Sequence, residues 1–166
     1  MREVEGLTNQ YIETLGKRIL GSNFLGCFAS DVPPKTNKKN FSVIFNLSEV
    51  NSKSKDDSNE HFIAIVFNNE KIMYFDSFGR KCSNKNILKF IKIRKGNRTL
   101  FENTEQVQSC SSYFCGYYCI SFLIACKLKI KLNTFLEMFD KNNLIKNDKI
   151  VVNYIQNFIK LKHIDQ

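Results

Sequence analysis

The chain has 166 residues, of which 43% are hydrophobic and 13% aromatic, a composition typical of a folded globular protein rather than a disordered one. No apolar run approaches the roughly 20 residues that span a bilayer, and residues 1–6 resemble no signal peptide, so neither membrane insertion nor secretion is expected. The 25 Lys and Arg against 16 Asp and Glu give a net charge of +9, which favours a polyanionic partner unless it serves solubility alone. We expect one domain over residues 1–166, with its six cysteines as free thiols.

The first half of the chain predicts a helix followed by β-strands. Apolar residues recur four apart over residues 7–20, which predicts an amphipathic helix, and a short apolar element follows at 24–29. Strands are predicted from β-branched and aromatic content at 41–47, 62–67 and 71–76. The last two flank a tight polar turn and form a hairpin, and both are apolar nearly throughout, as is typical of a sheet covered on both faces. Residues 48–59 are polar and charged and are predicted to form an exposed loop.

The second half predicts mainly helices. The helices are expected from Ser83 or Asn84 to Lys92, from Cys115 onward, over 134–139, and from Asn147 or Asp148 to about Ile159. Residues 98–101 and 105–108 are weaker strand candidates. This order predicts an α+β domain in which a central mixed β-sheet packs against helices.

The segment from Gln108 to Cys119 carries the strongest chemical signal. Gln108 stands seven residues before Cys115, which is followed directly by Gly116 and an apolar run suited to a buried helix. A cysteine in the first turn of a helix faces unpaired N–H groups and the positive end of the helix dipole, and both favour thiolate over thiol. Cys115 is therefore a candidate nucleophile, which would need a base, a group that orients the base, and donors for an oxyanion.

His61 and Asp76 are the candidates for base and orienting group. The chain has two histidines, and His61 begins the first hairpin strand while Asp76 ends the second, so a tight turn would make them neighbours. We expect Asp76 to accept the Nδ1–H of His61, with Nε2 facing Cys115. Each residue alone has an ordinary structural explanation. The joint order His, Asp, Gln and Cys-Gly, each at the end of an element, favours catalysis.

This set of residues resembles the adenovirus endopeptidase (adenain) family, with relatives in virophages and Maverick/Polinton-type elements, in the cysteine peptidase clan that also contains the Ulp/SENP SUMO proteases. The matching motifs are Phe24-Leu25-Gly26 followed by Pro33, the strand 41–46, His61-Phe62, Asp76-Ser77-Phe78-Gly79, and Gln108 to Cys115-Gly116. The resemblance implies that Cys115 is the nucleophile, His61 the base and Asp76 its orienter. It also implies that Gln108 and the Cys115 backbone N–H donate to the oxyanion, with the nucleophile at the N-terminus of a buried helix.

The chain departs from the family pattern at three positions. Phe62 stands where the family usually has tryptophan, and we expect its ring to cover one face of the imidazole. Asp76 replaces the glutamate of adenain, and the clan uses either acid. No cysteine lies near Asn97, where some adenoviral enzymes bond an activating peptide, so disulfide-linked activation of that form is not expected.

The family resemblance implies an endopeptidase that cleaves viral capsid and core precursor proteins during virion maturation, at Gly-containing sites. A monomer is expected in the virion and the infected host cell, neither membrane-bound nor secreted. The chemistry needs no cofactor, while DNA or an activating peptide are the accessory partners that the resemblance suggests. The basic residues that would contact DNA are Arg80, Lys81, Lys85, Lys89, Lys92, Arg94, Lys95 and Arg98. A solvated lysine face explains the same run equally well.

Two alternative functions fit the same sequence. One is a protease for ubiquitin-like tails, a deSUMOylase or deubiquitinase of the same clan, although 166 residues leave little room for a dedicated docking surface. The other is a basic nucleic-acid-binding protein without enzymatic activity, in which Cys115 is only structural. The spacing of Cys110, Cys115 and Cys119 does not match paired zinc ligands, so no metal site is expected.

Overall fold

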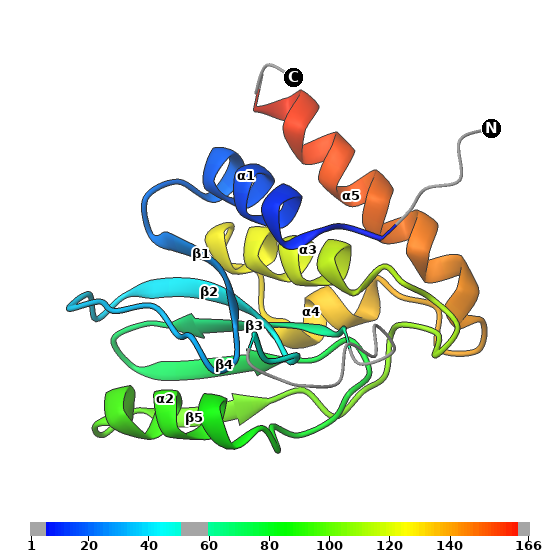
Figure 1. Cartoon of the computed structure of the whole chain (residues 1–166). Helices are drawn as coiled ribbons and strands as arrows, with labels where there is room; N and C mark the ends of the chain where they lie inside the picture. Colours follow the sequence, from blue (N-terminus) through cyan, green and yellow to red (C-terminus); the bar gives the residue numbers. More distant parts are fainter. Residues whose placement is uncertain (1–5, 51–59, 163–166) are drawn as a thin grey trace.

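In the computed structural model, which describes residues 6–50 and 60–162, helices pack on both faces of one five-stranded sheet (Figure 1). The strands are β1 (Phe24–Ala29), β2 (Phe41–Asn46), β3 (Phe62–Phe67), β4 (Lys71–Phe75) and β5 (Thr99–Glu102). The helices are α1 (Asn9–Leu20), α2 (Lys85–Lys95), α3 (Cys115–Lys127), α4 (Leu132–Glu137) and α5 (Asn147–Leu161), with a 3₁₀ turn η2 (Leu144–Lys146) before the last.

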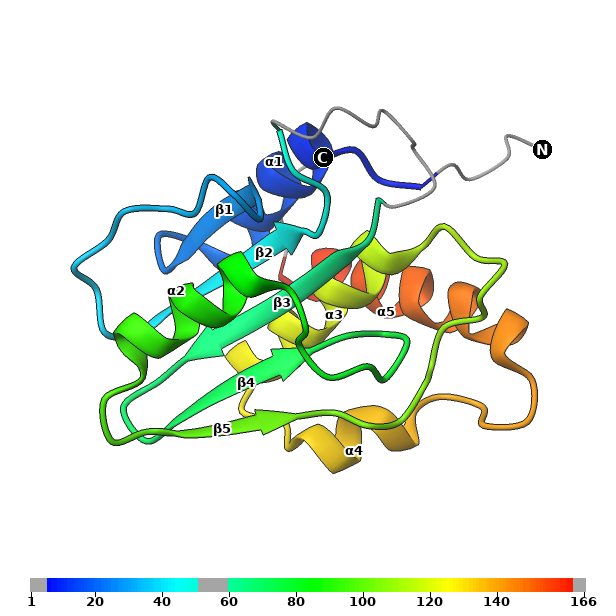
Figure 2. The ribbon, with the colours of Figure 1, turned by 60° about the horizontal axis from the view of Figure 1, so that its bottom comes forward.

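The sheet is mixed, as the sequence predicts. Its strands lie in the order β1-β2-β3-β4-β5 (Figure 2). The outer pairs β1–β2 and β4–β5 are parallel, whereas β2–β3 and β3–β4 are antiparallel. The predicted hairpin is thus confirmed as the pair β3–β4, and the α+β class with it.

The central strands are covered on both faces because successive side chains of a strand point to opposite sides. In β3, Ile63 and Ile65 pack with residues of α2, whereas Phe62 and Ala64 pack with residues of α3. Helix α2 lies on one face of the sheet, and α1, α3 and α5 lie on the other (Figure 1). This double cover accounts for the nearly continuous apolar sequence of the hairpin strands.

Helix α3 is the central helix of the domain. Most of its side chains are buried, and it contacts β3, α1 and α5. A helix that is apolar all round has to be enclosed by other elements. Gly116 allows this enclosure at the first turn, because a Cβ there would lie 2.8 Å from Ile12 Cδ1 of α1. Over residues 6–50 and 60–162, no helix is long and apolar enough to cross a membrane.

Two segments differ from the sequence-based expectation or fall outside it. Residues 105–108 are not a strand; instead the backbone N–H groups of Val107 and Gln108 both donate to the Ser77 carbonyl, at 2.9 and 3.1 Å. A single carbonyl that accepts two consecutive N–H groups cannot belong to a regular ladder, so this segment crosses the end of β4 rather than pairing along it. Of the predicted loop 48–59, residues 51–59 lie outside the described part of the chain.

The turn after β4 is shaped by Gly79. Its φ of +70° lies in the region that favours glycine, and its N–H donates to the Asp76 carbonyl at 2.8 Å. A Cβ on this residue would lie 2.8 Å from backbone atoms of Thr104, Glu105 and Gln106. Gly79 therefore lets residues 104–106, which follow β5, pack closely against the turn after Asp76.

We predict that Gly79→Ala lowers the free energy of unfolding by about 3 kcal/mol, because it combines an unfavourable φ with a backbone clash. Gly96→Ala is the matched control: its φ is +54°, but nothing lies within 4 Å of the added Cβ, and we expect a loss of about 1 kcal/mol. Urea unfolding of both variants measures the difference. Equal losses would show that the contact between residues 79 and 104–106 is unimportant.

Candidate active site

The Cys115 thiol lies where the sequence predicts it, at the first residue of α3. The residue is 7% exposed, so the sulfur is largely shielded from water. Phe114 stands at the N-cap and has no side-chain acceptor for the N–H groups of the first turn. The Cys115 side chain lies close enough to the His61 imidazole to raise its pKa, although the two residues are 54 positions apart in the chain.

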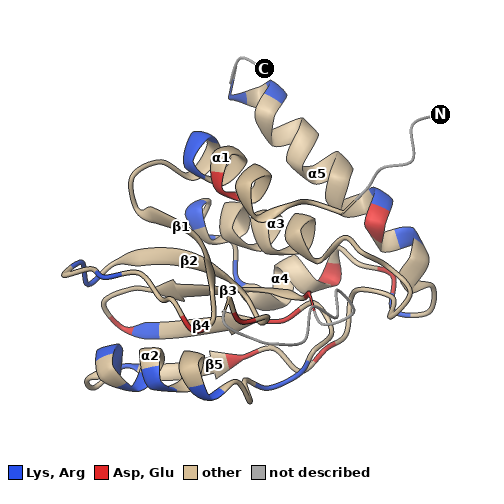
Figure 3. Ribbon diagram, viewed as in Figure 1, with Lys and Arg blue, Asp and Glu red and all other residues tan. Residues whose placement is uncertain are grey.

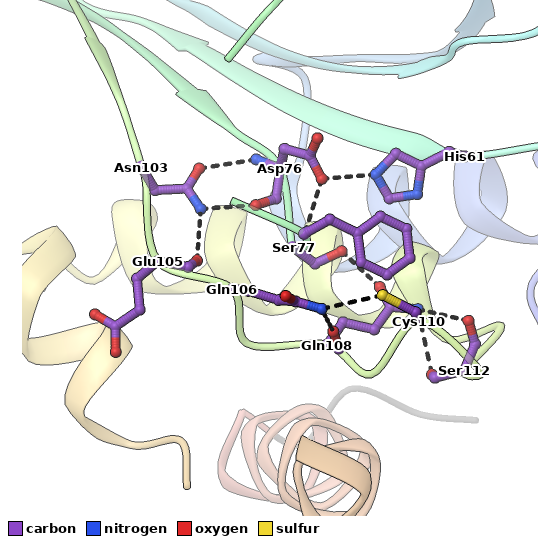
Figure 4. A network of polar contacts seen from close by, with 10 residues as sticks. His61, Asp76, Ser77, Asn103, Glu105, Gln106, Gln108, Cys110 and Ser112 are labelled. Carbon is purple, nitrogen blue, oxygen red and sulfur yellow. Dashed lines mark hydrogen bonds and ion pairs between the residues drawn. The ribbon is translucent and has the colours of Figure 1, made fainter. Parts of the chain in front are cut away.

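His61 is held on its other side by Asp76. Phe75 pairs with Ala64, so the end of β4 lies across from the beginning of β3 and brings the two side chains together. His61 Nε2 lies 2.7 Å from Asp76 Oδ1 (Figure 4). The expected choice of ring nitrogen is therefore wrong: Asp76 occupies Nε2, which leaves Nδ1 for Cys115. His61 directly precedes β3 and Asp76 directly follows β4, and in this arrangement the carboxylate meets the outer end of the imidazole ring, where Nε2 lies.

These contacts decide the charge of the imidazole. Burial by itself lowers the pKa of His61, but the hydrogen bonds and charges of Asp76 and Cys115 outweigh it and raise this pKa to about 9. At neutral pH the imidazole is therefore protonated beside the sulfur. A protonated imidazole stabilises a thiolate by charge, and it can later give up its proton to a leaving group.

Asp76 itself is fixed by backbone and side-chain contacts that the sequence did not indicate. Its backbone N–H donates to Asn103 Oδ1 at 2.9 Å, and its carbonyl accepts from Asn103 Nδ2 at 2.7 Å. Its carboxylate also accepts the N–H of Phe78 at 2.8 Å. Asn103 follows β5 and shares no local motif with Asp76, so only the parallel pairing of β4 and β5 brings them together.

The aromatic cover of the imidazole comes from Phe78 and not from Phe62. The Phe78 and His61 rings stack with centroids 4.5 Å apart and planes at 20°. Phe62 is 3% exposed and packs in the core with α3, since the residue after His61 enters the strand and points inward. The Arg80 guanidinium lies 4.7 Å from the centre of the Phe78 ring. Phe78 belongs to the Asp-Ser-Phe-Gly motif, but the motif does not show that its ring stacks on His61.

Gln108 is completely buried, with both ends of its amide engaged (Figure 4). Oε1 accepts the Ser77 hydroxyl at 2.5 Å, and Nε2 donates to the Ser112 carbonyl at 2.9 Å and to Ser112 Oγ at 3.2 Å. The residue thus lies beside the loop that leads into Cys115. Its expected role as an oxyanion donor stays a prediction.

The six cysteines are all free, and they differ in burial. Burial raises the pKa of the Cys27 and Cys126 thiols to about 12 and raises that of Cys119 and Cys82 as well. These four therefore stay protonated near neutral pH. Cys110 is exposed and its sulfur accepts a contact from Gln106 Nε2 at 3.3 Å, so it is the thiol that experiments on Cys115 must control for.

The predicted DNA-contacting residues do not form one surface. Lys85, Lys89 and Lys92 are exposed and three to four residues apart on α2, a helix with several basic residues that lies on the side of the sheet opposite α3 (Figure 3). The guanidinium groups of two others are occupied by backbone carbonyls: Arg94 donates to Phe90 and Pro34, and Arg98 donates to Lys39, Asn68, Arg94 and Lys95. Arg80 lies at Phe78, beside the candidate site. Lys81 and Lys95 are exposed before and at the end of α2.

The fold matches that of cysteine peptidases. The ASFV pS273R protease superposes with a TM-score of 0.60 at 15% identity, over 90% of this chain and 67% of that chain. For the SUMO protease Ulp1 the TM-score is 0.55 at 13% identity, over 95% of this chain and 81% of that one. ChlaDub1 from Chlamydia trachomatis gives 0.52 at 14% identity, over 95% and 78%. At such identities the similarity concerns the fold.

The sequence itself identifies the family. The profile of the adenovirus endoprotease family matches residues 24–164, which is most of the chain. The chain therefore belongs to this family and is a cysteine peptidase, which confirms the resemblance drawn from the motifs. No curated protein matches the sequence significantly.

Peptidases of this family need no cofactor for their chemistry. In the part of the chain that the structure describes, no group of three or more His, Cys, Asp or Glu side chains could hold a metal ion. The candidate site consists of a thiol, an imidazole and a carboxylate, with an amide beside them.

We predict that Asp76→Asn lowers the pKa of His61 from about 9 toward its ordinary value near 6.5, because the strongest group favouring the imidazolium is lost. NMR titration of the imidazole in a His163→Gln background, where only one histidine remains, measures the shift. Glu137→Gln, an exposed acid-to-amide change, is the control. An unchanged pKa in Asp76→Asn would contradict the assigned pairing.

The same contact makes stability depend on pH. Because the folded-state pKa lies above the unfolded one, the contribution is complete below about pH 6.5. It is lost as the pH rises through about 9. The difference in unfolding free energy between the wild type and Asp76→Asn should therefore shrink over that window.

Proposed function

We propose that this peptidase is an endopeptidase in which Cys115 is the nucleophile, His61 the general base and acid, and Asp76 the group that orients His61. The thiolate attacks the scissile carbonyl, and the negative oxygen that forms accepts hydrogen bonds from Gln108 Nε2 and the Cys115 backbone N–H. His61 gives its proton to the leaving amine as the C–N bond breaks, which leaves a thioester on Cys115. His61 then takes a proton from water, whose oxygen attacks the thioester and releases the acid.

The observation that carries this proposal is the contact of one imidazole with two partners. His61 Nε2 lies 2.7 Å from Asp76 Oδ1, and Cys115 lies close enough to the same ring to raise its pKa. A histidine buried between a carboxylate and a thiol at a helix start has the geometry that activated-cysteine hydrolysis needs. Family membership supports the reaction type.

We further propose that the substrates are capsid and core precursor proteins, cut at Gly-containing sites during virion maturation. The enzyme would then act as a monomer in virus particles and in the infected cell. A preference for glycine follows if the substrate backbone has to approach the buried thiol closely, since only a residue without a side chain permits this. The low exposure of Cys115, 7%, supports such a restriction.

A second candidate is a protease for ubiquitin-like proteins. The fold similarity to the SUMO protease Ulp1 favours it, because the same fold serves that activity there. The two candidates differ in what the enzyme recognises: a short extended segment for a maturation enzyme, or a folded domain for a ubiquitin-like protease.

We predict that internally quenched peptides with a central Gly are cleaved, and that Cys115→Ala and His61→Ala lower kcat/KM by at least about 1000-fold. Precursor proteins encoded by the same genome should be shortened on co-expression with the wild type and stay full length with Cys115→Ala. Rapid alkylation of Cys115 at neutral pH, followed in a Cys110→Ser background and lost in His61→Ala, reports on the activated thiol directly.

The outcomes separate the candidates. Cleavage of SUMO or ubiquitin fusions without cleavage of short peptides would replace the maturation role by the ubiquitin-like one. Slow alkylation that is insensitive to His61→Ala would remove the enzymatic proposal and leave a non-enzymatic basic protein.

We also propose that DNA binds to the lysine face of α2. Lys85, Lys89 and Lys92 are exposed and three to four residues apart, and Lys81 and Lys95 extend the charge at either end. Such a row can neutralise several phosphates without reading sequence. Because α2 and α3 lie on opposite sides of the sheet, DNA held here would leave the candidate site open to substrate.

We predict that replacing Lys85, Lys89 and Lys92 by Gln weakens duplex DNA binding and reduces the slope of log affinity against log salt by about 2 to 3. The matched control replaces Lys131, Lys149 and Lys160, which are also exposed but lie on other helices or loops. Fluorescence anisotropy over a range of salt concentrations measures both. Equal effects of the two triple variants would reduce the proposal to nonspecific attraction by net charge.

A further inference from the structure

The amide of Gln108 can be oriented in only one way by the groups around it. At one end the Ser77 hydroxyl lies 2.5 Å from Oε1, and at the other end the Ser112 carbonyl lies 2.9 Å from Nε2. A carbonyl only accepts, so the atom facing Ser112 has to be the nitrogen. Ser77 also accepts the backbone N–H of Gln108 through its carbonyl at 3.1 Å, which fixes the main chain of the same residue.

The Ser112 hydroxyl is polarised by a residue of another element. Ser112 Oγ donates to Asp148 Oδ1 at 2.9 Å, and Asp148 lies in the first turn of α5. An ionised carboxylate cannot donate, so the hydroxyl hydrogen points to Asp148 and only lone pairs remain for other neighbours. Those lone pairs accept Gln108 Nε2 at 3.2 Å and the Phe114 N–H at 3.2 Å.

We propose that Ser77, Ser112 and Asp148 are positioning residues that keep the N–H groups of Gln108 directed at the loop entering Cys115, ready for the oxyanion. The Ser77 hydroxyl donates to Oε1 of Gln108 and so fixes the oxygen end of the amide. Asp148 takes the hydroxyl hydrogen of Ser112, so Ser112 Oγ can only accept a hydrogen bond from Nε2 of Gln108. An amide that flipped would place an oxygen at the oxyanion and repel it. The inference rests on the proposed role of Gln108.

The two N–H groups of Gln108 Nε2 have different acceptors, the carbonyl and the hydroxyl oxygen of Ser112. The shorter bond, 2.9 Å to the Ser112 carbonyl, holds the nitrogen in place. The longer contact, 3.2 Å to Ser112 Oγ, is the weaker one and is exchanged for the oxyanion when it forms. Ser112 Oγ keeps its other partners, Asp148 and the Phe114 N–H, so this exchange leaves no buried group without a hydrogen bond.

Comparing two reactions of the same thiol tests the proposal. Alkylation of Cys115 by iodoacetamide, followed in the Cys110→Ser background, forms no oxyanion, whereas hydrolysis of a quenched Gly-containing peptide does. We expect Ser77→Ala and Asp148→Asn each to lower kcat roughly tenfold, with KM and the alkylation rate unchanged. Gln108→Ala sets the scale, with a fall in kcat of about 100- to 1000-fold at an unchanged alkylation rate.

Ser111→Ala is the matched control, because Ser111 lies in the same loop and its hydroxyl contacts Ser109; it should keep both rates. A normal alkylation rate also shows that each variant has folded with its thiol in place. If Gln108→Ala separates the two rates and the Ser77 and Asp148 variants do not, the positioning inference is overturned and the proposed function stands. If Gln108→Ala itself leaves kcat unchanged, the oxyanion role of Gln108 fails while Cys115 and His61 keep theirs.

Discussion

The hydrogen bond between His61 and Asp76 is the interaction on which the rest of the site depends. It joins the residue before β3 to the residue after β4, so it exists only while these strands keep their register. Together with the charge of Asp76 and the nearby Cys115, it outweighs the cost of burying a protonated imidazole. Two cores support this geometry, one under α2 and one under α3, and both include side chains of β3.

The polar groups around the thiol come from segments far apart in the chain. Asn103 after β5 fixes Asp76, and Ser77 after β4 fixes Gln108. Asp148, at the start of α5, reaches Ser112 in the loop before α3. These contacts join the segments that directly follow β4 and β5 to the loop before α3 and to the first turn of α5, so the ends of rigid strands and helices hold the polar groups around Cys115. A side chain larger than that of glycine would not fit at Gly79 or Gly116, because the backbone of residues 104–106 lies against the first and Ile12 lies against the second.

Much of the candidate site could be predicted from the sequence. The hairpin, the buried helix and the order His, Asp, Gln and Cys-Gly are local signals, and the structure brings His61, Asp76 and Cys115 together. Asn103 and Asp148 could not be predicted, because an asparagine after a strand and an aspartate in a first helical turn are common for local reasons. Their partners lie 27 and 36 residues away in the chain.

By itself, the sequence determined most of the helices and strands and indicated the candidate side chains of the site, because periodicity and motif spacing act over short stretches of chain. Tertiary structure alone decided how those side chains are turned. It placed Asp76 at Nε2 rather than Nδ1 of His61, and Phe78 rather than Phe62 on the imidazole. It also turned residues 105–108 away from the sheet and onto Ser77. Such orientations depend on the packing of distant segments against one another, which no local pattern encodes.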